Sequence, residues 1–330
     1  MRPDGGTTLL SRVADSLYWM SRYLERAEHT ARLIDVDLQL RLEQSEDDGS
    51  GRWWLGLLQA LQVTPVNSGR VDATTLTQIV TLDRSNPSSI LSCISAAREN
   101  LRHVREQCSS EMWEQLNRLY LQMNTTPPGE AWLLHSHLFF RAVQEGAHLF
   151  QGITDSTMGH GEGWHYIQLG RYVERTDALA KLIGTHFSRL PYPLDQAVES
   201  EEHLEWVGLL KSCAAFEAYC KAYTAELRPL RVAEFLLLNK EFPHSVRFSV
   251  DQVHGALRAI GELTERKAEQ PVRLAGRLRA TLSFSQIDEI MASGANAYMD
   301  GIRRQCAQAH AAIRQIYFDY SVESALAPQR

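Results

Sequence analysis

The sequence predicts an all-α protein, and three observations support this prediction. Apolar residues in the best-patterned stretches recur three and four positions apart, which is the spacing of one helix face. Alternating β-branched runs that would indicate strands extend over only a few positions. A pattern Arg-Tyr-x-Glu-Arg occurs twice, at 22–26 and 171–175, each time inside a helix-patterned stretch. We therefore expect a multi-helix bundle built from two tandemly duplicated halves.

The first helix-patterned stretch covers residues 9–38. An apolar stripe runs along it in alternate steps of four and three: Val13, Leu17, Met20, Leu24, Ala27, Ala31, Ile34 and Leu38. Such a stripe predicts the buried seam of a helix packed on other helices. The polar residues around the motif fall outside the seam and share another helix face: Arg22, Glu25, Arg26 and His29.

The second copy of the pattern lies within residues 165–187. Its stripe is formed by Tyr166, Leu169, Val173, Thr176, Ala180, Ile183 and Phe187. Its motif supplies Arg171, Glu174 and Arg175, again outside the stripe. We expect this stretch to be the second core helix and to pack like the first.

Polar, Gly- and Pro-containing breaks separate further helices between the two copies. We expect these helices at about 53–61, 72–82, 88–107, 110–124 and 130–151. Asn86 and Pro87 precede the third of them, and these residue types favour the cap and the first helical position. Asn86 is therefore expected to cap that helix, and Ser109 and Ser110 to start the next.

Further landmarks recur in the same order in both parts of the chain. They are Trp54-Leu55-Gly56-Leu57-Leu58 with Trp206-Val207-Gly208-Leu209-Leu210, Leu82-Asp83-Arg84 with Leu238-Asn239-Lys240, Pro87 with Pro243, and Ser89-Ile90 with Ser245-Val246. Colinear matches favour tandem duplication. We expect halves at 9–160 and 161–322, packed as one domain about a pseudo-twofold axis, and a tail at 323–330.

Composition narrows the class of protein. The chain has 330 residues, of which 44% are hydrophobic, and a net charge of −6, which argues against a generally basic nucleic-acid-binding surface. Its five cysteines are odd in number and form no C-x-x-C pair, as expected of reduced thiols. The first residues lack a signal-peptide pattern, and no apolar run reaches the roughly 20 residues of a membrane span. We expect a cytoplasmic protein that binds neither membranes nor nucleic acid.

The two motifs are the main candidates for a functional site. Two guanidinium groups beside a carboxylate can bind an anionic group, so Arg22, Arg26, Arg171 and Arg175 are candidate anion- or substrate-binding residues. Glu25 and Glu174 are candidate catalytic residues. The structural alternative is a network of ion pairs. If the two faces meet across the axis, both glutamates should approach each other among four arginines, and this centre should bind an anion or recruit Glu28 and Asp177.

Other kinds of site have weaker signals. Glu145 and His148 have the Glu-x-x-His spacing of di-iron bundles, and Asp251 and His254 have the same spacing. Glu25 and Glu174 would be the obvious further ligands of such a centre. His135 and His137 point to different sides of a helix, and the cysteines sit in apolar stretches. Phosphate-binding loops, dinucleotide fingerprints and nucleophile elbows are missing, so we expect no cofactor.

Several long stretches resemble one known family. They are LLSRVADSLYWMSRYLERAEHTARLIDV, ISAARENLRHVREQCSSEMWEQLN, DSTMGHGEGWHYIQLGRYVERTDALAKLI and FLLLNKEFPHSVRF. Together they resemble the bacterial alpha-E domain family over about residues 8–322. The resemblance implies an all-helical protein associated with circularly permuted ATP-grasp ligases and transglutaminase-like proteins, in a setting of ATP-dependent amide-bond formation. The glutamates that match the family's motif are Glu25 and Glu174.

Three functions follow as alternatives. The first is an accessory module that docks an ATP-grasp peptide ligase or presents its substrate. The second is an enzyme that uses the paired Glu and Arg residues on a carboxylate or peptide. The third is a metal-binding helical bundle.

Overall fold

The computed structural model describes residues 9–43, 56, 60–61, 73–125, 136–188, 198, 200–224, 226–264 and 269–318. All regular structure in these ranges is helical, so the predicted all-α class is confirmed. Most of the helix expected at 53–61, with the Trp54 landmark, lies outside the described residues. The expected tail at 323–330 and His135 also lie outside them.

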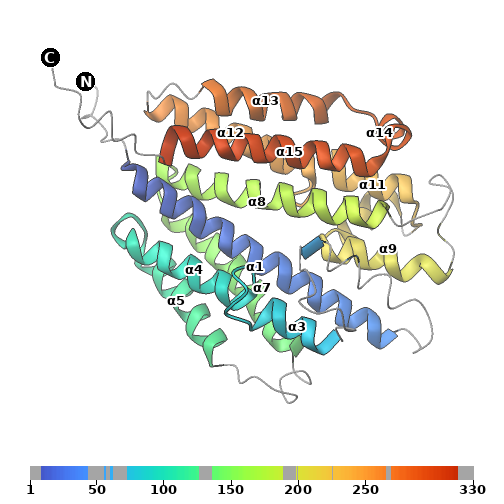
Figure 1. Ribbon diagram of the computed structural model, residues 1–330, viewed down its shortest axis with the longest axis horizontal. Coiled ribbons are helices and arrows are strands. Elements are labelled where there is room, and N and C mark those ends of the chain that lie inside the picture. The colour runs from blue at the N-terminus through green and yellow to red at the C-terminus, as the bar shows by residue number, and fades with distance from the viewer. Residues whose placement is uncertain are drawn as a thin grey trace.

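Two long helices form the centre of the molecule, α1 (Ser11–Glu43) and α8 (Glu162–Phe187). They run side by side through the middle of the fold (Figure 1). Every member of the two predicted seams is buried except Leu38, which is half-buried. The helices lie very close together at Gly170, where an added Cβ would lie 2.2 Å from the backbone oxygen of Tyr18. The second core helix therefore depends on a residue without a side chain at this position.

Helices from the first part of the chain cover α1. They are α3 (Ala73–Thr81), α4 (Ile90–His103), a short 3₁₀ helix (Arg105–Gln107), α5 (Ser110–Asn124) and α7 (Ser136–Thr157). Both α4 and α7 pack on α1, and α5 packs on both of these helices. The expected boundary between the halves falls in the short connection between α7 and α8.

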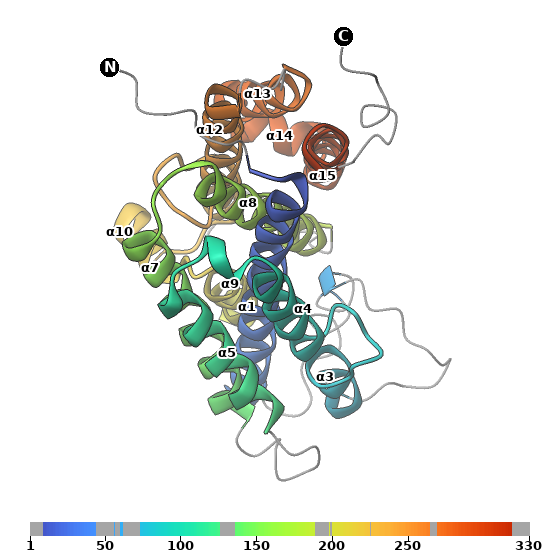
Figure 2. The same ribbon diagram turned by 90° about the vertical axis from the view of Figure 1, so that its left-hand side faces the viewer.

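Helices from the second part of the chain surround α8. They are α9 (Ser200–Ser212), α10 (Phe216–Tyr223), α11 (Pro229–Leu238), α12 (Val246–Thr264), α13 (Glu269–Phe284), α14 (Ile287–Ser293), α15 (Ala295–Ile313) and a π-helical turn (Arg314–Phe318). Both α12 and α15 pack on α8, α13 packs on both of these helices, and α9 also packs on α1. Figure 2 shows α12, α13 and α15 at one end of the molecule and α3 and α5 at the other.

The capping residue of α4 differs from the prediction. The helix begins at Ile90 with Ser89 as its N-cap, and the Ser89 hydroxyl accepts a hydrogen bond from the Ser92 amide at 3.2 Å. Asn86 instead accepts from the Ser88 amide at 3.0 Å, two residues on, which is a local turn that an Asn side chain readily makes. The prediction that Asn86 caps this helix was wrong. Ser109 does cap α5, as expected.

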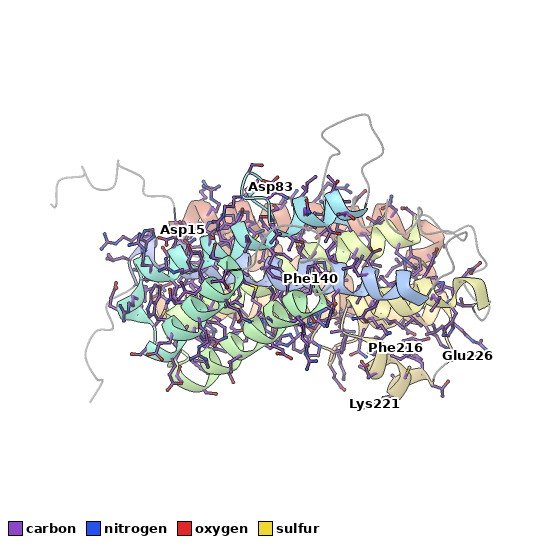
Figure 3. All side chains as sticks on the ribbon, turned by 90° about the horizontal axis from the view of Figure 1, so that it is seen from below. Asp15, Asp83, Phe140, Phe216, Lys221 and Glu226 are labelled. Carbon is purple, nitrogen blue, oxygen red and sulfur yellow. The ribbon has the colours of Figure 1, made fainter. Side chains whose placement is uncertain are left out.

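The core is continuous from α5 to α13. Figure 3 places Phe140 among the packed helices and Asp83, Lys221 and Glu226 at the outside. All five cysteines are free, as expected. None of the helices within the described residues is long and apolar enough to cross a membrane.

Candidate functional site

The polar faces of α1 and α8 meet, and each motif's glutamate is held by arginines of the other motif. Glu174 accepts hydrogen bonds from Arg22 Nε at 2.7 Å and from Arg26 Nε at 2.6 Å. Asp177 lies one helical turn further along α8, with the Lys181 ammonium 3.8 Å from its carboxylate. We call these five residues the Glu174 cluster.

The reciprocal contact lies between Glu25 and the arginines of α8. Arg175 donates to Glu25 from Nε at 2.5 Å and from Nη2 at 3.0 Å, and Arg171 Nε lies 3.7 Å from the same carboxylate. One turn along α1, Arg32 donates to the buried Glu28. These residues form the Glu25 cluster: Glu25, Glu28, Arg32, Arg171 and Arg175.

The seams explain why these charged residues are enclosed. Besides each other, α1 packs mainly on α4 and α7, and α8 mainly on α12 and α15, so the charged side chains lie in the contact between α1 and α8. Glu25 and Arg175 are each only 3% exposed. Charges buried to this degree must be paired, and the reciprocal contact pairs them.

The expectation that both glutamates share one centre needs correction. Glu174 lines a cavity with Arg22 and Arg26, whereas Glu25 lines a different, much smaller hollow with Arg171. Arg22 and Arg26 bind Glu174, whereas Arg171 and Arg175 contact Glu25, so the two carboxylates lie in separate clusters with no common arginine. The molecule therefore contains two arginine clusters rather than one.

Sequence reasoning missed two members of these clusters. Arg32 and Lys181 stand at corresponding distances after the two motifs, and each pairs with the acid four residues before it. These acids are Glu28 and Asp177, which were expected to join the arginines. Extending the comparison of the two copies by one more helical turn would have found both basic residues.

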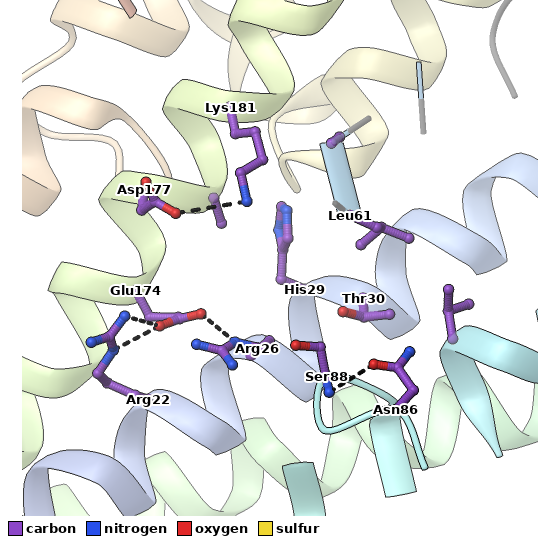
Figure 4. A pocket seen from close by; sticks show the side chains of 13 residues that line it. Arg22, Arg26, His29, Thr30, Leu61, Asn86, Ser88, Glu174, Asp177 and Lys181 are labelled. Atoms are coloured by element: carbon purple, nitrogen blue, oxygen red, sulfur yellow. Dashed lines mark hydrogen bonds and ion pairs between the residues drawn. The ribbon is translucent and has the colours of Figure 1, made fainter. Parts of the chain in front are cut away.

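The larger cavity lies beside the Glu174 cluster and has a volume of about 160 Å³. Figure 4 shows Arg26, Glu174 and Lys181 around it. Its described lining consists of Arg22, Arg26, His29, Thr30, Ala60, Leu61, Val80, Asn86, Ser88, Glu174, Asp177, Ala178 and Lys181. The hollow beside Glu25 and Arg171 measures only about 10 Å³.

The electrostatics of the larger cavity keep the Glu174 carboxylate ionised. Burial by itself raises the pKa of Glu174, but Arg22 and Arg26 outweigh burial and lower this pKa to about 2. Burial lowers the pKa of Lys181, an effect that Asp177 opposes. Burial also lowers the pKa of His29, so this imidazole is uncharged at neutral pH.

Aromatic residues hold Arg22 in place. Its guanidinium lies 4.8 Å from the ring centroid of Trp19 and 5.6 Å from that of Tyr18. The Tyr18 hydroxyl donates to His310 Nδ1 at 2.7 Å. Burial and the nearby Arg22 lower the pKa of His310 to about 4, so its ring is neutral and can accept this bond. No sequence pattern singles out His310, which comes from α15.

The candidate metal ligands are not brought together. Glu145 pairs with Arg141 at 2.7 Å on the surface of α7, and His148 lies 3.6 Å from Glu28. Asp251 pairs with Arg279 at 2.8 Å beside α13. Within the described ranges, no three His, Cys, Asp or Glu side chains form a group that could hold a metal ion.

The fold and the two clusters define a class of protein: an all-helical domain with Glu-Arg motifs buried between two central helices. A family model described as a predicted alpha-helical domain with a conserved ER motif matches residues 9–318. The chain belongs to this family, Alpha-E. Its two RYxER motifs contain such pairs at Glu25-Arg26 and Glu174-Arg175.

Curated relatives come from mycobacteria. Uncharacterized proteins of Mycobacterium bovis and of two Mycobacterium tuberculosis strains are each 22% identical over 96% of this chain. The match covers 37% of each relative, so the chain spans well under half of their length. No solved structure matches the chain.

Proposed function

We propose that the protein is a non-catalytic helical module that docks an ATP-grasp type amide ligase or presents its peptide or carboxylate substrate. We infer the ligase, and a transglutaminase-like protein as a second partner, from the resemblance to the alpha-E family. The structure supports the proposal through the chemistry of the two clusters.

The observation that carries the proposal is that arginines hold both motif glutamates. A general acid or base works best with a pKa near the working pH, which enzymes reach by raising the pKa of a carboxyl group. The pKa of Glu174 is shifted the other way, to about 2. Burial raises the pKa of the Cys93 thiol, which lies near Arg26, to about 12. These groups suit recognition of a ligand better than proton transfer.

The lengths of the relatives support a role beside another protein. In the mycobacterial proteins the matched region is 37% of the chain, so a domain similar to this one is there part of a longer polypeptide. A module that acts on a neighbouring domain or subunit fits this arrangement better than a self-sufficient enzyme does.

We also propose that the two halves arose by tandem duplication. Asp83 accepts from the amide of Ser85, and Asn239 accepts from the amide of Glu241, so the two landmarks make the same turn. In both landmarks the capping serine stands six residues after the side chain that accepts in this turn. Ser245 then accepts from the Phe248 amide at 3.0 Å, just as Ser89 caps α4. The reciprocal clusters fit a pseudo-twofold relation between α1 and α8.

The test combines association and activity. The full chain would be mixed with an ATP-grasp ligase of the kind that the resemblance implies, and complex formation and ATP-dependent amide formation would both be measured. We expect a complex at about micromolar concentration and a change in the rate or substrate range of the ligase. If neither is seen, the proposal is wrong. Turnover by the isolated chain that is lost in a folded Glu174→Gln variant would favour the enzyme alternative instead.

A further inference from the structure

The two arginine clusters offer an internal comparison that indicates a ligand. The turn before α4 reads Asn86-Pro87-Ser88, and the turn before α12 reads Phe242-Pro243-His244, in the same place relative to the capping serine. Each turn lies against one of the clusters. What the two turns contribute can therefore be compared position by position.

At the Glu25 cluster, the protein's own chain satisfies the second arginine of the motif. Arg175 directs two donors to Glu25 and gives Nη1 to the backbone oxygen of Pro243 at 3.1 Å. His244 lies within electrostatic reach of Arg175 and of Glu28, and burial lowers its pKa well below the usual range, so its ring is uncharged. A carbonyl oxygen and an aromatic side chain thus occupy this side of the α1–α8 contact.

At the Glu174 cluster, the corresponding arginine, Arg26, has fewer acceptors among the described residues than Arg175 has. Arg26 uses Nε for Glu174, and in the described part of the chain no acceptor is bonded to its terminal nitrogens. The Lys181 ammonium has only the 3.8 Å contact with Asp177 among the described residues. Ser88 stands where His244 stands in the other turn, and it lines the cavity. Figure 4 shows Arg26 and Lys181 on two sides of this space.

Charge and size restrict what the cavity can hold. Its lining carries three cations and two carboxylates, with His29 uncharged, and Arg303 from outside the lining donates to Asp177 at 3.2 Å, so positive charge remains for a ligand to balance. An anionic ligand meets this requirement. A planar carboxylate also matches the fork of guanidinium donors. A cavity of about 150 Å³ holds a benzene-sized molecule, so about 160 Å³ admits a molecule of amino-acid size.

We propose that the cavity between Arg26 and Lys181 binds a small aliphatic carboxylate of amino-acid size, free or as the last residue of a peptide. The carboxylate takes the place at Arg26 that the Pro243 oxygen takes at Arg175, and its aliphatic part packs against Leu61, Val80 and Ala178. This inference names the class of ligand that the proposed module would bind, and it rests on the proposed function only for its biological context.

The test measures binding by the full chain with isothermal titration calorimetry. The probes are N-acetyl-alanine, a tetrapeptide ending in alanine, the amides of both, and inorganic phosphate. We expect saturable binding of at least one carboxylate with a Kd on the order of 1 mM or tighter, and at least tenfold weaker binding of its amide and of phosphate. Preference for acetyl-alanine or for the peptide identifies the free or the chain-terminal source.

Three variants locate the site. Lys181→Met should weaken binding of the carboxylate by about tenfold or more, because it removes the cation and keeps the apolar stem. Ser88→His should abolish binding by placing in the cavity the side chain found in the other turn. Lys240→Met is the matched control, since that lysine also lies 3.8 Å from a carboxylate but is 69% exposed and outside the cavity. Circular dichroism checks that all variants fold.

The outcomes separate this inference from the proposed function. If neither carboxylate binds saturably, if an amide binds as well as its acid, or if both cavity variants bind like the wild type, the inference is wrong. If the protein fails these tests but still alters the ligase, the proposed function stands and the carboxylate site does not. If it passes them without affecting any ligase, only the carboxylate site stands.

Discussion

The Glu25 and Glu174 clusters use corresponding residues but differ in what satisfies their arginines. Arg175 is 3% exposed and is bonded to both Glu25 and a backbone oxygen, whereas Arg26 is 27% exposed and borders a cavity. Each guanidinium nitrogen of Arg175 donates to a protein oxygen, and such a buried ion pair stabilises one arrangement of two helices. An equivalent pair with donors left over can also bind a ligand. The difference indicates that the Glu25 cluster mainly holds the fold and that the Glu174 cluster is the better candidate for a site.

The largest expected effect comes from removing the enclosed carboxylate. Glu25→Gln leaves Arg175 buried without its counter-charge and should lower the free energy of unfolding by about 3–5 kcal/mol. Glu174→Gln should cost less, because Arg26 can reach water. Urea denaturation of both single variants and the double variant measures these values. The two clusters share no partner, so the effects should add within about 0.5 kcal/mol; a larger coupling would mean that the clusters act as one.

The seam residues test whether the two core helices are equally buried. Leu24 is 2% exposed and Val173 is 4% exposed at corresponding positions of the stripes. Leu24→Ala should lower the free energy of unfolding by about 2–5 kcal/mol, through lost burial and a cavity. Val173→Ala removes fewer atoms and should cost about 2 kcal/mol. An unchanged melting temperature for Leu24→Ala would contradict the seam assignment.

A single added methyl group can test how closely α1 and α8 must approach each other. A Cβ at Gly170 would meet the Tyr18 backbone oxygen at 2.2 Å, so Gly170→Ala must push α1 and α8 apart. We expect a loss of about 1–3 kcal/mol in unfolding free energy, and weaker ion pairs in both clusters. Gly152→Ala in α7 is the control. It meets nothing within 4 Å and should stabilise the protein by up to about 1 kcal/mol.

Acidification should produce the smallest effect close to neutral pH. His310 has a folded-state pKa of about 4, lowered by burial and by Arg22, against about 6.5 in the unfolded chain. The unfolded chain binds the proton first, so stability is full above pH 6.5 and falls as the pH drops from 6.5 toward 4. The melting temperature of His310→Gln should depend less on pH in this window. An identical dependence would show that His310 does not contribute.

A second acid transition follows from Glu174. Its folded-state pKa of about 2 lies below the value of about 4.3 for an unpaired glutamate, so its contribution is present above about pH 4.3 and is lost toward pH 2. Glu174→Gln should flatten the loss of stability in this lower range alone. The two pH ranges therefore separate the contribution of the Glu174 ion pair to stability from that of the aromatic residues and His310 around Arg22.

Part of the site could be read from the sequence because it is local. The arginines and glutamate of each motif lie within two helical turns, so their common face follows from helix periodicity alone. The same reasoning finds Glu28 with Arg32 and Asp177 with Lys181. The choice of Ser89 over Asn86 as a cap was not decided in this way, because both side chains can cap and the start of the helix depends on how the turn packs.

By itself, the sequence determined that the protein is helical, which stripes are buried and which polar residues share a face, because these properties arise between residues a few positions apart. Only the tertiary structure decided that Glu25 pairs with Arg175 and Glu174 with Arg26, since these contacts join helices far apart in the chain. It also decided that His310 supports Arg22 through Tyr18. The tertiary structure likewise placed the turn with Ser88 beside Lys181, where a cavity remains, and the turn with His244 beside Arg175. Packing between helices far apart in the chain decides both positions.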